Sequence, residues 1–195
     1  MQTKRKTMIV TGASQGIGAG VTNAFIERGY NVVANSLNIT VSSFGATDRL
    51  AVVRGDIGDP ATAREIASTA IKAFGSIDGV VNNAGIFVSK PFTEYTAEDF
   101  EKLSATNLKG YVYITQLAVK QMLMQNSGGS VTCVTSAMVE HPIAGINALP
   151  WSRNADSRRS RWAAPGSTRR KVYGSTPSLR ESLIRLCTQM IPASF

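Results

Sequence analysis

A glycine-rich run near the start of the chain has the residue types and spacing of an anion-binding turn. Glycines let a backbone turn tightly and approach a pyrophosphate, and the start of a following helix offers amide donors and a positive dipole end. A glycine pattern alone is also compatible with a bare turn, so the elements on either side decide its interpretation. The run includes Gly12, Ser14, Gly16, Ile17 and Gly18.

The elements around this run alternate between strands and helices. An apolar strand precedes the glycines and an amphipathic helix follows them, as phosphate binding at a helix start requires. This alternation predicts an α/β fold, with a parallel sheet covered by helices on both faces. The predicted strands are Thr7–Val10, Asn31–Ala34, Leu50–Val53, Ile77–Asn82 and Ser130–Ser136. The predicted helices are Ala19–Arg28, Thr62–Phe74 and 97–125, the last with a break near Gly110.

The glycine spacing and a second motif together resemble one protein family. Gly12, Gly16 and Gly18 follow the pattern G-x-x-x-G-x-G, and Asn82-Asn83-Ala84-Gly85 follows the fourth predicted strand. On these residues the chain resembles the short-chain dehydrogenase/reductases over about residues 5–150. The resemblance implies a Rossmann-type doubly wound parallel sheet, incomplete at its C-terminal end.

The resemblance also implies a binding site for NADP or NAD. The glycine-rich run matches the family's phosphate-binding turn. Asp56 and Ile57 match the acid and the apolar neighbour that flank the adenine. Asn83, Ala84 and Gly85 match the segment that runs beside the adenine ribose and supports the sheet.

The end of the second predicted strand bears on the choice of cofactor. NAD enzymes usually place an acidic residue there to bind the ribose 2′-hydroxyl. Residues 35–38 contain no acid, so Ser36 is a candidate cofactor-binding residue and the stretch leaves room for a 2′-phosphate. We therefore favour NADP over NAD, although no Arg or Lys stands at 36–38 or at Gln15 to pair with the phosphate.

Two polar residues match catalytic positions of the family. Asn107 matches an asparagine that holds a water in a proton relay, and Ser136 matches the serine that hydrogen-bonds the substrate. A helix-bending polar residue and a strand-end turn residue are the alternative interpretations. The family's tyrosine, its general acid or base, and the partner lysine would fall at Leu149 and Arg153. Leucine cannot transfer a proton. The resemblance to an enzyme family therefore does not by itself make this chain an enzyme.

The character of the chain changes at about residue 150. Residues 151–195 contain nine Lys and Arg, two Asp and Glu, and eight Ser. We predict an NAD(P)-binding Rossmann domain over 1–150 and a basic, disordered tail over 151–195. A shifted reading frame makes residues 172–181 compatible with V-R-V-N-A-V-A-P-G, a hallmark of the family, so we interpret the tail as out of frame. The fifth strand should then be an unprotected edge, in a truncated chain prone to aggregation.

Composition argues against several other classes. The formal net charge is +8, but residues 1–150 carry only +1, and no nucleic-acid reading element accompanies the basic tail. No apolar run is long enough for a membrane span, and no cleavage site follows the basic start. Cys133 and Cys187 form no zinc spacing, so we expect no metal site and a reducing, cytoplasmic location.

Together these observations predict an NAD(P)-dependent oxidoreductase lineage that interconverts a small-molecule carbonyl and an alcohol by hydride transfer. A 3-oxoacyl-thioester reductase is one candidate on resemblance alone, and members of the family are usually homodimers or homotetramers. Without the tyrosine and the lysine, we expect this chain to be inactive. A non-catalytic dinucleotide-binding protein and a non-functional truncated product are the alternatives.

Overall fold

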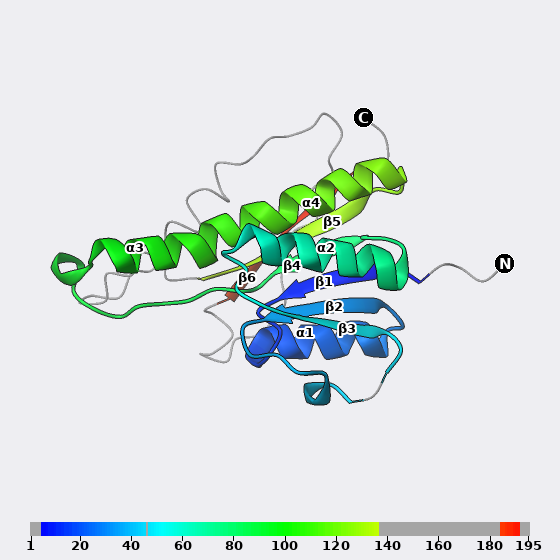
Figure 1. Ribbon diagram of the computed structural model, residues 1–195, viewed down its shortest axis with the longest axis horizontal. Helices are drawn as coiled ribbons and strands as arrows, with labels where there is room; N and C mark the ends of the chain where they lie inside the picture. The colour runs from blue at the N-terminus through cyan, green and yellow to red at the C-terminus, as the bar shows by residue number, and fades with distance from the viewer. Residues whose placement is uncertain (1–4, 46, 137–183, 192–195) are drawn as a thin grey trace.

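The computed structural model describes residues 5–45, 47–136 and 184–191, which form a six-stranded sheet flanked by helices (Figure 1). The strands are β1 (Thr7–Thr11), β2 (Asn31–Ser36), β3 (Leu50–Arg54), β4 (Gly79–Asn82), β5 (Gly129–Ser136) and β6 (Ile184–Ile191). Their order is β3-β2-β1-β4-β5-β6, and the first five run parallel. The predicted Rossmann-type parallel sheet is therefore confirmed. Its strand order reverses between β1 and β4, where α/β proteins bind their ligands.

Helices cover both faces of this sheet, as alternating strands and helices predicted. The helices are α1 (Gly16–Glu27), α2 (Pro60–Phe74), α3 (Ala97–Ser104) and α4 (Gly110–Gln125), with a π-helical turn η3 (Ala105–Lys109) and short 3-10 turns η1 (Val41–Ser43) and η2 (Phe92–Glu94). No helix within the described ranges is long and apolar enough to cross a lipid bilayer.

Two cores form because successive side chains of a strand point to opposite faces. Ile9 and Val80 pack with residues of α2 and α4 on one face. Val10 and Val32 pack with Ile26 of α1 on the other. Every residue of β1 is buried, as expected for a central parallel strand covered on both sides.

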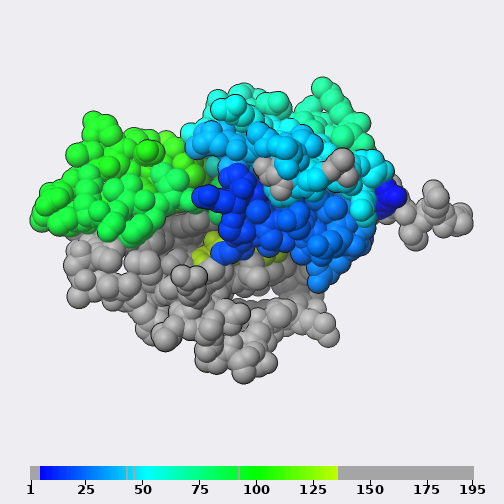
Figure 2. Space-filling view, turned by 90° about the horizontal axis from the view of Figure 1, so that it is seen from below, coloured from blue at the N-terminus to red at the C-terminus, as the bar shows by residue number. Residues whose placement is uncertain are grey.

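The elements α3, η3 and α4 form one long helical rod. The predicted break near Gly110 is confirmed as the π-helical turn directly before it. A Cβ at Gly110 would lie 2.8 Å from Ile57 Cγ2, so glycine is needed for this close packing. At the other end, Gln125 Oε1 accepts from Ile77 N at 2.8 Å and Gln125 Nε2 donates to Ile77 O at 3.0 Å. The rod is thus fixed beside the start of β4, while the green residues around α3 extend beyond the blue and cyan residues (Figure 2).

β6 overturns the expectation that β5 is an unprotected edge. It pairs antiparallel with β5 over eight positions, from Gly129 opposite Ile191 to Ser136 opposite Ile184. This pairing gives the outer side of β5 the backbone partners that a free edge lacks. The prediction of a disordered tail concerns mainly residues 151–183, which lie outside the described ranges.

Candidate functional site

The glycine-rich turn joins the end of β1 to the start of α1. Gly12 and Gly16 have left-handed backbone angles, with φ of +64° and +57°, which glycine adopts at little cost. Between them, Ala13 N donates to Asn35 O at 2.9 Å. The turn is therefore held against β2 at the edge where the parallel strands end.

The turn also packs tightly on the segment that follows β4. A Cβ at Gly12 would lie 2.7 Å from Ala84 Cα, and a Cβ at Gly18 would lie 2.2 Å from Gly12 O and 2.6 Å from Asn83 Nδ2. Neither glycine could be replaced without displacing backbone. At Gly16, by contrast, a Cβ would meet nothing within 4 Å. The space beside Gly16 is open, as the close approach of a ligand to this backbone requires.

A small polar network holds the turn in place. Thr11 Oγ1 accepts from Asn83 N at 3.1 Å and from Ala84 N at 3.0 Å. Asn83 Nδ2 donates to Thr11 O at 3.1 Å and to Gly12 O at 3.0 Å. Thr11 was not among the predicted site residues. Its signal in the sequence is a polar residue that closes an apolar strand directly before a glycine.

The first turn of α1 is suited to an anion. Its N-cap residue, Gln15, makes no side-chain hydrogen bond to the turn, and the turn contains no acidic residue. The first N–H groups of a helix lack intrahelical partners, and the helix dipole adds partial positive charge there. Together with the open space at Gly16, these groups fit the diphosphate of a dinucleotide.

The end of β2 meets the glycine-rich turn through two serines. Ser14 Oγ and Ser36 Oγ lie 3.0 Å apart, which is hydrogen-bonding distance. Both are predicted cofactor-binding residues, and the fold brings them together from positions 22 residues apart. The two groups that lie beside the turn at the end of β2 are therefore neutral hydroxyls.

At the end of β3, Asp56 and Ile57 have different surroundings. Asp56 is exposed and its Oδ1 accepts from Gly58 N at 2.8 Å, which shapes the turn into α2. The Ile57 side chain is only 5% exposed and packs in the core that α2 and α4 cover. The Ile57 side chain therefore faces the core, whereas the Asp56 carboxylate is accessible.

Asn107 lies in the π-helical turn, where it is 4% exposed. Its Oδ1 accepts from Ile86 N at 2.9 Å and its Nδ2 donates to Ile86 O at 3.0 Å. The side chain therefore holds the segment after β4, and both ends of its amide have protein partners. The family resemblance implies a water relay at this residue. Such a water would have to bind the second lone pair of Oδ1, the second N–H of Nδ2, or the backbone of the π-helical turn.

An ion pair connects the loop between Gly85 and α3 to the first turn of α3. Lys90 Nζ pairs with Asp99 Oδ2 and lies 5.5 Å from the centroid of the Tyr95 ring. Thr96 and Asp99 also form a capping box at the start of α3. The hydrogen bond from Lys90, followed by that from the Thr96 backbone, lowers the pKa of Asp99 below its ordinary value of 3.8.

Comparison with known proteins places these features in a family. A model of the short chain dehydrogenases matches residues 6–152, which is more than half of the chain. The chain belongs to the short chain dehydrogenase family. The match contains the glycine-rich turn, Asp56, the Asn83 segment, Asn107 and Ser136.

Several dehydrogenases are similar to the chain over most of this range. The NADP-dependent (R)-specific alcohol dehydrogenase of Lentilactobacillus kefiri is 36% identical over 138 residues, 68% of this chain and 55% of that protein. The L-rhamnose 1-dehydrogenase (NAD(P)(+)) of Sphingomonas sp. (strain SKA58) is 34% identical over 140 residues, 67% of this chain and 54% of the relative. A short-chain dehydrogenase from Streptomyces avermitilis matches with a TM-score of 0.72 and 25% identity, over 82% of this chain and 59% of that one. The chain spans about half the length of the curated relatives it matches.

Most residues predicted from the family motifs lie at one edge of the sheet. The glycine-rich turn, Ser36, Asp56 and the segment Asn83–Gly85 all follow the carboxyl ends of parallel strands. Ser136 is the last residue of β5 and lies at the same edge. Leu149 and Arg153, the predicted counterparts of the family's tyrosine and lysine, lie outside the described residues.

Proposed function

We propose that this chain carries the dinucleotide-binding part of a short chain dehydrogenase, from a lineage that interconverts alcohols and carbonyls, and that it is itself inactive. The observation that carries the proposal is the turn between β1 and α1. It combines uncapped helix N–H groups, no acidic residue and open space beside Gly16. Two relatives, an NADP-dependent alcohol dehydrogenase and an NAD(P)(+) L-rhamnose dehydrogenase, support the same chemistry.

The residues at the carboxyl ends of the parallel strands would each contact a different part of the cofactor. The start of α1 would bind the diphosphate, Ser14 and Ser36 would face the adenine ribose, and Asp56 would bind the adenine. The bound cofactor supplies or accepts the hydride. Asn83 holds the turn in the binding geometry through Thr11 O and Gly12 O.

The proposed inactivity rests on the sequence at two positions. Leu149 cannot donate or accept a proton, and Arg153 stands where the lysine partner of the tyrosine belongs. Losing a general acid or base typically lowers a rate by about 10²–10⁴-fold. We propose that small alcohols or sugars are the substrates of the lineage and that this chain does not turn them over.

The test uses the full chain in two assays. Calorimetric titration with NADPH and NADH should show saturable binding, and Gly18→Ala should weaken it. A panel of ketones, sugars and 3-oxo thioesters should show no turnover with either cofactor. Turnover of about one per second on any substrate would refute the inactivity, and the absence of binding would refute the cofactor site.

A further inference from the structure

The end of β3 is fixed beside the end of β2, and this places a basic side chain at the edge of the candidate site. Ser36 and Arg54 are partners in the parallel register of the two strands. Asn35 is 1% exposed, and its Nδ2 donates to Val53 O at 3.0 Å and to Gly55 O at 3.2 Å. These two carbonyls flank Arg54 in the chain, so a buried amide sets the position of its backbone.

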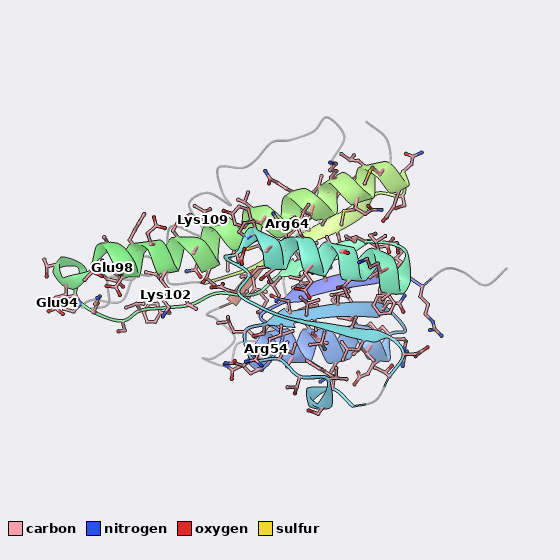
Figure 3. All side chains as sticks on the ribbon, in the orientation of Figure 1. Arg54, Arg64, Glu94, Glu98, Lys102 and Lys109 are labelled. Atoms are coloured by element: carbon pink, nitrogen blue, oxygen red, sulfur yellow. The ribbon has the colours of Figure 1, made fainter. Side chains whose placement is uncertain are left out.

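The Arg54 side chain reaches across to the residue that follows β2. Its Nε donates to Leu37 O at 3.0 Å, and the side chain is exposed. No ion pair found among the described residues involves Arg54. Within the described part of the chain, this hydrogen bond orients the guanidinium group and leaves its terminal nitrogens for an anion. Figure 3 shows Arg54 at the end of the sheet where β1 and β2 also end.

Three kinds of group therefore converge where the adenine ribose of a cofactor would lie. They are the Arg54 guanidinium, the hydroxyls of Ser14 and Ser36, and a stretch, 35–38, without any acid. A free ribose 2′-hydroxyl is usually bound by an acidic acceptor, whereas a 2′-phosphate requires donors and positive charge. The groups at this position are donors.

We propose that Arg54, from β3, binds the 2′-phosphate of NADP(H) and makes the chain select NADP(H) over NAD(H). The proposal rests on the cofactor site described under Proposed function and adds the residue that discriminates between the two cofactors. No Arg or Lys stands at position 15 or at 36–38, so a basic residue for the phosphate has to come from elsewhere in the chain. The β2–β3 register, not sequence proximity, brings Arg54 to Ser36.

Binding of two cofactor fragments to the full chain tests the proposal without any need for turnover. The fragments are 2′,5′-ADP, which carries the ribose 2′-phosphate, and 5′-AMP, which lacks it. Wild type should bind 2′,5′-ADP more tightly. Arg54→Gln should weaken the binding of 2′,5′-ADP by about 10- to 100-fold, the range for hydrogen bonds to charged groups. It should leave the affinity for 5′-AMP unchanged. Arg54→Lys should keep part of the preference because it keeps the charge.

Arg28→Ala is the matched control. Arg28 is also exposed and also donates one hydrogen bond to a backbone carbonyl, Ala24 O at 3.1 Å, but it lies at the opposite end of α1 from the glycine-rich turn. It should leave the binding of both fragments unchanged. The wild-type preference should also fall as salt is raised, because Arg54 is exposed.

The outcomes separate this inference from the proposed function. Equal binding of the two fragments by wild type, or equal loss of both in Arg54→Gln, overturns the role of Arg54 and leaves the cofactor site standing. If wild type binds neither fragment and neither full cofactor, the cofactor site itself is wrong and the inference falls with it. A thermal melt of each variant identifies any loss that comes from unfolding.

Discussion

At the scale of single residues, most polar side chains of the site bind backbone. Asn35, Asn83 and Asn107 each direct a side-chain amide at main-chain groups of a neighbouring segment. A buried amide without partners would cost about 1–3 kcal/mol, so these contacts are both satisfied and specific. They position the turn, β3 and the segment after β4, whereas the ligand contacts that we propose are made by exposed groups such as Asp56 and Arg54.

Replacing Gly18 by alanine tests this close packing. The added Cβ would lie 2.2 Å from Gly12 O, so the turn must shift away from its binding geometry. We expect at least about tenfold weaker dinucleotide binding and a loss of about 1–3 kcal/mol in the free energy of unfolding. Calorimetry and urea denaturation measure the two quantities.

Gly20 is the control for that substitution. It lies in the same helix, and a Cβ there would meet nothing within 4 Å. Gly20→Ala should raise stability by up to about 1 kcal/mol, because alanine favours helix more than glycine does, and should leave binding unchanged. Equal effects of the two substitutions would show that helix propensity, and not packing on the turn, explains both.

At the scale of elements, α3 begins with a capping box whose acidic residue also pairs with a lysine of the preceding loop. Asp99 accepts from Thr96 N at 2.9 Å and pairs with Lys90. The same carboxylate therefore caps the helix and anchors the loop that leads from Gly85. Loop and helix should loosen together when this carboxylate loses its charge.

Acid should weaken this helix start. The folded-state pKa of Asp99 is lowered, mainly by Lys90, so its stabilisation is complete above the ordinary value of 3.8 and is lost as the pH falls through the lowered pKa. Urea midpoints measured from about pH 6 to about pH 3 should fall more in wild type than in Asp99→Asn, which lacks this titration. Parallel pH profiles for the two proteins would contradict the assignment.

At the scale of the whole molecule, the sheet is extended by a strand from far along the chain. β5 is followed by β6 at a separation of more than 40 residues, and the two pair in opposite directions. The two outermost strands of the described sheet are then β6 and β3. β5, the longest of the five parallel strands, therefore lies in the interior of the sheet, between β4 and β6.

Removing β6 tests whether its pairing with β5 protects the chain against aggregation and unfolding. A chain that ends at residue 183 would leave the backbone groups on the outer side of β5 without their antiparallel partner, and such edges favour intermolecular pairing. We expect faster aggregation, followed by light scattering at equal protein concentration, and a lower unfolding temperature. A truncated chain as soluble and as stable as the full one would show that β6 contributes no protection.

Sequence patterns predicted the parts of the fold that depend on neighbours in the chain. The five parallel strands and the glycine-rich turn follow from local apolar runs and glycine spacing. β6 could not be predicted because its pairing with β5 joins distant segments. Arg54 was missed for the same reason, since only the β2–β3 register places it beside Ser36. The start of α1 at Gly16 rather than Ala19 shows that Gly16 and Gly18, but not Gly12, belong to the first helical turn.

The two amide contacts of the long helical rod also limit how its length can vary. Asn107 and Gln125 are 18 positions apart, about 27 Å along a helix, and their partners Ile86 and Ile77 are nine positions apart, about 30 Å if extended. Inserting or deleting one residue between the amides would rotate one end by about 100°, so only one contact could survive. We therefore expect the length of the helical segment between these two amides to be fixed.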